Sequence, residues 1–188
     1  MTVEPIREKR LIQKMQTYLK GKSMRDWLLF NLGINTGLRI SDILNLKVSD
    51  LKTDKGNFRE YILIKEKKTG KAKKFKPNNA TKKYIDEYLK ANSLNSNDYL
   101  FQSRKGDNKP ITRVQAYRTL KEAADQLNIT DFGTHTMRKT WGFWSYKASK
   151  YNLALIMDTF NHSSQRVTLK YIGINQEQKD ELYSMVEF

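Results

Sequence analysis

The sequence predicts a single α+β domain that is mainly α-helical and carries one small antiparallel β-sheet. Apolar residues recur at three- and four-residue spacing through most of the 188 residues, which is typical of amphipathic helices. The exception is the segment 61–76, where a β-rich run, a Thr69-Gly70 turn and a second run predict a hairpin. No internal repeat, low-complexity tract or Pro/Gly-rich linker divides the chain, so we expect residues 1–188 to form one domain.

The composition indicates a polyanionic partner. With 35 Lys and Arg against 20 Asp and Glu, the formal net charge is +15 at pH 7. Such a surplus attracts polyanions, and nucleic acid is the commonest of them. Charge alone is also compatible with a basic protein that binds no nucleic acid.

The residue types that are missing argue against several kinds of chemistry. There is no cysteine, which excludes disulfides, thiolate catalysis and Cys-ligated zinc or iron–sulfur sites. Two histidines argue against a multi-His metal site, so we expect no metal and no cofactor. The start of the chain lacks a secretory pattern, and no run approaches the roughly 20 apolar residues of a membrane helix. We expect a cytoplasmic, DNA-associated protein without a membrane partner.

Two helices are predicted at the N-terminal end. Pro5 is suited to a helix start, and apolar or aromatic residues then follow at helical spacing as far as Gly21. Ser23 and Asp26 have the spacing of a capping box for a second helix, whose apolar residues run toward Gly33. These positions indicate core, with no chemistry in them.

A short helix is predicted after Gly37, and its first turn carries Arg39 and Asp42 one turn apart. Spacing alone favours an ordinary ion pair at the surface. The alternative is a guanidinium held in position to bind a phosphate with its planar fork.

The predicted hairpin is rich in lysine. Between residues 65 and 76 there are seven lysines and a single acid, Glu66. The lysines are Lys65, Lys67, Lys68, Lys71, Lys73, Lys74 and Lys76. Such a hairpin is typically a solvated edge that resists aggregation, and it is also suited to lie along a DNA backbone. We expect Lys68, beside the turn, to be the lysine that reaches inward.

Beyond the hairpin the chain is predicted to be mainly helical. The expected elements are a helix at Tyr84–Leu89, an extended piece at Asp98–Phe101, a basic loop at Ser103–Pro110, a helix capped by Thr112 and Gln115, a helix beginning near His135, a buried helix at Leu153–Phe160 and an amphipathic tail helix within 175–188. Met137, Trp141 and Trp144 fall on one face of their helix, which indicates core rather than a base-stacking surface. The tail helix is equally suited to dock on its own domain or on a neighbouring protomer.

The segment from Thr134 to Ile174 carries most of the candidate chemistry, including both histidines. His135 lies three residues before Arg138, which places the two side chains on one helix face, and His162 lies nine residues before Tyr171. Two imidazoles, a guanidinium and a phenol suit one task above others, which is to hold a phosphodiester while an oxygen nucleophile attacks it.

These segments together resemble the catalytic domain of the tyrosine recombinases, the phage and transposon integrase family that includes the Xer recombinases. Gly-Leu-Arg39-Ile-Ser-Asp42-Ile resembles the box that holds the family's first arginine. Lys68-Thr-Gly resembles its hairpin lysine.

The remaining boxes follow in the family's order. His135-Thr-Met-Arg138 resembles the box of the second arginine, Asn-His162-Ser-Ser the Gly-His-Ser box, and Tyr171-Ile-Gly-Ile the nucleophile segment. The resemblance runs from about Ile6 to the C-terminus. Five boxes in the right order make it specific, whereas each box alone is a weak signal.

The resemblance implies an exchange of phosphodiester bonds at Tyr171. Its hydroxyl attacks a phosphorus of double-stranded DNA, giving a 3′-phosphotyrosyl link and a free 5′-hydroxyl, and a second 5′-hydroxyl then reverses the step on another strand. Neither ATP nor a metal is implied, because the ester conserves the bond energy and arginines supply positive charge. The family also implies a tetramer on DNA and a monomer or weak oligomer without it.

The resemblance also assigns roles to the other site residues. Arg39 and Arg138 would clamp the non-bridging oxygens, and His162 would donate a hydrogen bond to the same phosphate. Lys68 would protonate the departing 5′-oxygen. His135 would either accept the phenol proton or orient the phosphate, and the sequence does not separate these two roles.

Further basic residues are candidates for contacts with the DNA backbone. They are Lys65, Lys67, Lys71, Lys73, Lys74, Arg104, Lys105 and Lys139. The alternatives to a recombinase are a DNA-binding module that no longer recombines, and relaxation of supercoils by the chemistry of type IB topoisomerases.

The chain departs from the family pattern at three points. Asn161 replaces the glycine that commonly precedes the third-box histidine, and Gly142-Phe143-Trp144 replaces small residues after the second box. Only 38 residues precede Arg39, so we expect the family's N-terminal core-binding domain to be absent.

Overall fold

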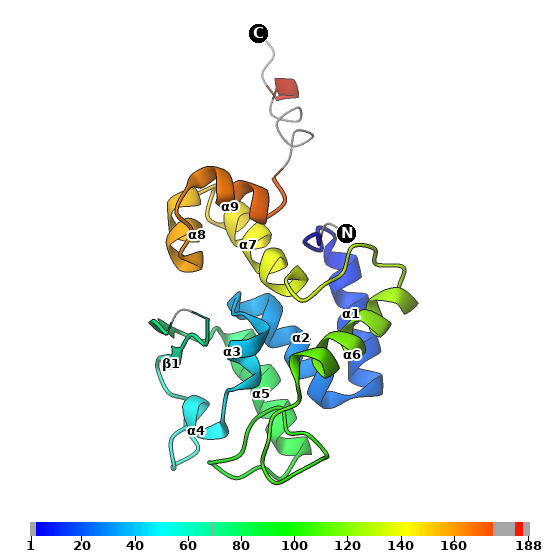
Figure 1. Cartoon of the computed structure of the whole chain (residues 1–188), viewed down its shortest axis with the longest axis vertical. Helices are drawn as coiled ribbons and strands as arrows, with labels where there is room; N and C mark the ends of the chain where they lie inside the picture. The colour runs from blue at the N-terminus through cyan, green and yellow to red at the C-terminus, as the bar shows by residue number, and fades with distance from the viewer. Residues whose placement is uncertain (1–2, 69, 175–182, 186–188) are drawn as a thin grey trace.

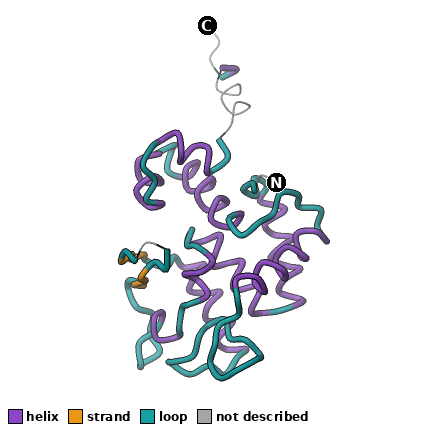
Figure 2. Tube along the Cα trace, viewed as in Figure 1, coloured by secondary structure: helices purple, strands orange, loops and turns teal. Residues whose placement is uncertain are grey.

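The computed structural model describes residues 3–68, 70–174 and 183–185 (Figure 1). It confirms a mainly helical fold with one small antiparallel sheet, and Figure 2 shows the strands confined to a single hairpin. The helices are α1 (Lys9–Lys22), α2 (Met24–Thr36), α3 (Ile40–Leu44), α4 (Val48–Leu51), α5 (Asn79–Ala91), α6 (Arg113–Gln126), α7 (Thr136–Ala148), α8 (Leu153–Phe160) and α9 (Gln165–Tyr171). The strands are β1 (Ile62–Lys65) and β2 (Ala72–Phe75).

Helix α2 forms the centre of the main core and packs against α1, α5 and α7. Its residues from Asp26 to Gly33 are all buried, as expected of a helix that is surrounded by other elements. Half of the predicted capping box is confirmed, since the Ser23 side chain accepts a hydrogen bond from the Asp26 amide, whereas the Ser23 amide donates to the Leu19 carbonyl rather than to the Asp26 side chain. The helix ends at Thr36 because Gly37 adopts a left-handed conformation, with φ of 63°.

Helix α1 begins at Lys9 rather than at Pro5, so that prediction was wrong. The preceding segment is held along α7 instead. The Ile6 amide donates to Thr140 Oγ1 at 2.9 Å, and the Ile6 carbonyl accepts from Trp144 Nε1 at 3.0 Å. The bond to Trp144 uses the Ile6 carbonyl, which a helix starting at Pro5 would need for its own first turn, so the segment stays outside the helix.

The hairpin is confirmed, with β1 and β2 antiparallel and Ile62 opposite Phe75. Gly70, in the turn, has φ of 68°, a conformation that glycine adopts at little cost. The short helix α4 was missed, because four residues are too few to show a helical period. The segment Asp98–Phe101 contributes a single bridge, Lys47 to Tyr99, rather than a strand.

A second, smaller core joins α7, α8 and α9 at one end of the molecule (Figure 1). It is built on Ile156, Phe160 and Ile172. Helix α8 was predicted to be buried, but Leu155 is 60% exposed. The reason is that α8 makes its main packing contacts with α7 and α9 alone, which cover one of its faces.

Glycine at position 142 allows this close packing. A Cβ there would lie 2.8 Å from side-chain atoms of both Phe160 and Ile172. The predicted tail helix falls largely on residues 175–182 and 186–188, which lie outside the described part of the chain. Within the described ranges, no helix is long and apolar enough to cross a membrane.

Candidate active site

Two arginines from distant parts of the sequence meet at the junction of α3 and α7. Arg138 Nη1 donates to the Gly37 carbonyl at 2.6 Å, two residues before Arg39, which is the N-cap of α3. Gly37 is suited to this position for two reasons. Its φ is positive, and a Cβ there would lie 2.4 Å from the ring of Trp141 on α7.

Arg138 is fixed by backbone groups and by a ring. Only 3% of the residue is exposed. Its Nη2 donates to the Phe160 carbonyl at 3.4 Å, and the guanidinium carbon lies 4.2 Å from the centre of the Phe160 ring. The guanidinium is therefore held in one orientation before any substrate arrives, which suits a group that must bind a phosphate with its planar fork.

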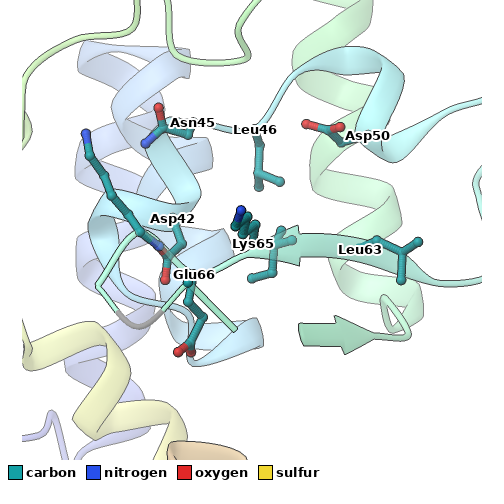
Figure 3. A pocket seen from close by; sticks show the side chains of 10 residues that line it. Asp42, Asn45, Leu46, Asp50, Leu63, Lys65 and Glu66 are labelled. Atoms are coloured by element: carbon teal, nitrogen blue, oxygen red, sulfur yellow. The ribbon is translucent and has the colours of Figure 1, made fainter. Parts of the chain in front are cut away.

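Arg39 forms its ion pair with Glu66, Nη1 to Oε1 at 2.6 Å, rather than with Asp42 as the spacing predicted. Asp42 instead accepts from the Lys67 amide at 3.0 Å. The Glu66 side chain is 1% exposed and the Arg39 side chain 18%. Figure 3 shows Glu66 and Asp42 at one side of the hollow between α3, α4 and β1, with Asp50 and Leu63 at the other side.

Glu66 is a site residue that the sequence motifs did not reveal. The sequence contains one sign of this role, because Glu66 is the single acid among the seven lysines of segment 65–76. A lone carboxylate in such a segment has a reason to be buried against a cation, since an unpaired buried charge is costly.

Tyr171 and His135 are in direct contact. The phenol oxygen lies 3.0 Å from His135 Nδ1. Burial raises the pKa of Tyr171, although the charge and hydrogen bond of Arg138 oppose this effect. Burial, Arg138 and Lys139 lower the pKa of His135 below 6.5. At neutral pH the phenol therefore keeps its proton and the imidazole is uncharged, so the pair is arranged for proton transfer from Tyr171 to His135.

His162 also packs against the phenol ring of Tyr171. The ring centres of His162 and Tyr171 are 5.0 Å apart, and His162 Nδ1 lies 3.1 Å from Thr168 Oγ1. Burial, Arg138 and Arg39 lower the pKa of His162. The residue before it, Asn161, has φ of 54°. This left-handed conformation explains why asparagine substitutes for glycine there, since asparagine tolerates it better than most residues.

Two lysines of the hairpin lie at the site. Lys68 shares a hollow of about 480 Å³ with Arg39 and His135. Lys73 Nζ donates to the Thr159 carbonyl at 2.9 Å. Burial and the charge of Arg138 lower the pKa of Lys73 to about 8. Lys68 was expected to be the one inward-reaching lysine, so this expectation was incomplete.

The other predicted DNA contacts fall into two groups. Those that are exposed are Lys65, Lys67, Lys71, Lys74, Arg104 and Lys105. Lys139 differs, because its Nζ donates to the Val3 carbonyl at 2.6 Å and lies 5.4 Å from the centre of the Tyr171 ring. It is thus engaged with the N-terminal segment and the phenol, which makes it a poor candidate for a backbone contact.

Comparisons with known proteins agree with this arrangement. The model of the "Phage integrase family" matches residues 3–178. The chain is 42% identical over 175 residues to "Probable integrase/recombinase YoeC" of Bacillus subtilis (strain 168), covering 93% of this chain and 92% of that protein. It is 27% identical to "Type 1 fimbriae regulatory protein FimE" of Escherichia coli (strain K12), over 80% and 75% of the two chains.

Solved structures show the same fold. The crystal structure of XerA recombinase superposes with a TM-score of 0.76 at 18% identity, and covers all of this chain. The structure of XerH bound to a palindromic difH substrate, in a post-cleavage complex, superposes with a TM-score of 0.73 at 20% identity over 98% of this chain. This chain spans 66% and 53% of those two chains, respectively.

Proposed function

The chain belongs to the phage integrase family of tyrosine recombinases, and on that premise we propose that it cleaves and rejoins double-stranded DNA through a covalent ester at Tyr171. The observation that carries the proposal is the contact between the Tyr171 hydroxyl and His135 Nδ1 at 3.0 Å, beside the buried guanidinium of Arg138. A nucleophile, a base and a fixed cation thus come from α7 and α9 to one point.

In the cleavage step, the Tyr171 oxygen forms a bond to phosphorus while the bond from phosphorus to the 5′-oxygen breaks. His135 accepts the phenol proton, and Lys68 donates a proton to the departing 5′-oxygen. Arg39 and Arg138 stabilise the negative charge on the non-bridging oxygens. Rejoining is the reverse reaction with another 5′-hydroxyl, so no external energy source is needed.

Double-stranded DNA is the proposed partner, consistent with the net charge of +15 and with relatives whose solved structures contain DNA, such as a λ integrase dimer bound to a core site. We propose that residues 1–188 form one catalytic domain. We further propose a tetramer on DNA, because exchanging both strands of two duplexes requires four cleavages.

Covalent capture from a library of DNA sequences tests this function. The chain is incubated with a randomised library of nicked duplexes, in which the short cleaved strand diffuses away and traps the adduct. We expect SDS-resistant protein–DNA adducts that share a sequence, and no adduct from Tyr171→Phe. Sequence-selective binding without any adduct would instead indicate a binding module, and relaxation of supercoils without site preference would indicate a topoisomerase.

Salt dependence tests the DNA contacts separately. Each phosphate neutralised by the protein contributes about 0.9 to the slope of log affinity against log salt. We expect that replacing the exposed hairpin lysines other than Lys68 with glutamine lowers this slope and leaves the cleavage rate of bound DNA unchanged. An affinity that does not vary with salt would contradict the proposed partner.

A further inference from the structure

The hydroxyl of Thr168 lies against the inner nitrogen of His162. Thr168 Oγ1 is 3.1 Å from His162 Nδ1 and 3.1 Å from the Ser164 carbonyl. Thr168 is completely buried, so water does not compete for its hydroxyl. It is located on α9, one turn before Tyr171, and therefore links the proposed phosphate ligand to the helix that carries the nucleophile.

The hydroxyl has one proton and two partners within reach. The Ser164 carbonyl can only accept, whereas Nδ1 either accepts or donates, depending on where the ring carries its proton. The Ser164 carbonyl also accepts the Thr168 amide at 3.2 Å. Turning the hydroxyl toward Nδ1 therefore leaves no buried polar group of this trio without a partner.

Both charge states of the ring can use this hydroxyl. When the ring is neutral, the hydroxyl donates to Nδ1 and the ring proton stays on Nε2. When the ring is positively charged, Nδ1–H donates to Thr168 Oγ1 and the hydroxyl turns to Ser164. In each case Nε2, on the opposite edge of the ring, carries a proton and can donate it to a phosphate oxygen.

The charges around His162 make the neutral state relevant. Arg39 and Arg138 face it from α3 and α7, and both lower its pKa together with burial. Asp158 and Lys71 line the same hollow beside the ring. A ring that is neutral at pH 7 would donate to a phosphate only if its proton is on Nε2, and a hydroxyl donor at Nδ1 provides this condition.

We propose that Thr168 is a positioning residue for His162. The Thr168 hydroxyl reverses its direction so that Nε2 of His162 keeps a proton whether the imidazole ring is neutral or charged. The role of His162 as a phosphate ligand rests on the proposed function. The hydrogen-bonding role of Thr168 does not, because it is a property of the chain without DNA.

Nitrogen NMR of the imidazole rings tests the hydrogen bond directly. The chain contains two histidines, so ¹⁵N-labelled protein shows two rings, and a His135→Gln variant assigns them. We expect the neutral His162 ring to carry its proton on Nε2. Thr168→Val, which has the same shape without the hydroxyl, should lose this preference and lower the pKa of His162. Thr168→Ser should retain both the proton on Nε2 and the wild-type pKa of His162. A neutral wild-type ring protonated on Nδ1, or an unchanged spectrum in Thr168→Val, would overturn the proposal.

Cleavage kinetics test the consequence for catalysis. Removing an outer partner that orients a ligand typically costs about 10–100-fold in activity, and we expect a loss of this size in the single-turnover rate of Thr168→Val, with DNA affinity unchanged and activity restored in Thr168→Ser. Thr119→Val is the matched control, because the Thr119 hydroxyl also bonds a carbonyl of its own helix, Ala116 at 3.2 Å, on α6. An equal loss in both valine variants would reduce the effect to general destabilisation and overturn the catalytic role.

The two experiments separate the possible failures. An unaltered cleavage rate in Thr168→Val, with the NMR change present, would contradict the role of Thr168 in catalysis. If wild type forms no adduct at all, the proposed function fails, and the NMR result still decides the hydrogen bond.

Discussion

Replacing Arg138 with lysine should abolish most cleavage while preserving charge. The guanidinium binds the Gly37 carbonyl through Nη1 and the Phe160 carbonyl through Nη2, at 2.6 and 3.4 Å. The three N–H donors of a lysine all lie on one nitrogen, which cannot occupy the positions of both Nη1 and Nη2, so a lysine cannot reach both carbonyls and a phosphate in this geometry. Losing one fixed donor to the transition state typically costs about 100–1,000-fold in rate. We therefore expect a drop of at least about 100-fold, which corresponds to about 2.7 kcal/mol of transition-state stabilisation.

The assay is single-turnover formation of the SDS-resistant adduct at saturating protein, with affinity measured separately by gel shift. We expect affinity and its salt dependence to change little in Arg138→Lys, because the net charge is the same. Arg118→Lys is the matched control, since Arg118 is exposed on α6. Melting curves check the fold, because hydrogen bonds to charged groups stabilise by about 1.5–3 kcal/mol. A folded Arg138→Lys protein that cleaves within a few-fold of wild type would contradict this role of the Arg138 guanidinium.

Three other predictions concern the base, the acid and the packing of the site. Because the pKa of His135 lies below 6.5, its neutral form predominates at pH 7, and the cleavage rate should fall as the pH drops below 7 through that pKa. A rate that rises on acidification would contradict its role as base. A DNA substrate with sulfur at the 5′ bridging position has a leaving group that needs no proton. This substrate should therefore restore cleavage by Lys68→Ala but not by Lys73→Ala. The reverse pattern would assign the role of general acid to Lys73. Gly142→Ala should lower both the melting temperature and the cleavage rate, because overpacking costs about 1–3 kcal/mol. Gly21→Ala is the control and should not destabilise the protein, because a Cβ at position 21 meets nothing within 4 Å. Equal melting temperatures of the two variants in calorimetry would contradict the close packing at Gly142.

Features that depend on neighbouring residues were predictable from the sequence. The Ser23 cap, the Thr112 cap and the hairpin turn at Gly70 are set by local hydrogen bonds and backbone preferences, and all three are present. The helical period likewise indicated most of the long helices, because their apolar faces meet one common core.

Features that depend on tertiary pairing were not predictable. The partner of Arg39 is Glu66 on the hairpin, and no local rule favours it over Asp42, one turn away. Lys73 and Thr168 owe their positions to carbonyls and rings brought close by folding. The exposed side of α8 has the same origin, because apolar content indicates burial without showing how many neighbours a helix will have.

The most direct measurement is the mass of the peptide that carries the DNA. Trypsin cleaves after Lys170, so the peptide released from the captured adduct begins at Tyr171 and ends at Lys179. After nuclease digestion, we expect this peptide to carry a nucleotide esterified through its 3′-phosphate to the tyrosine. A nucleotide on any other peptide, or an adduct that persists in Tyr171→Phe, would contradict it.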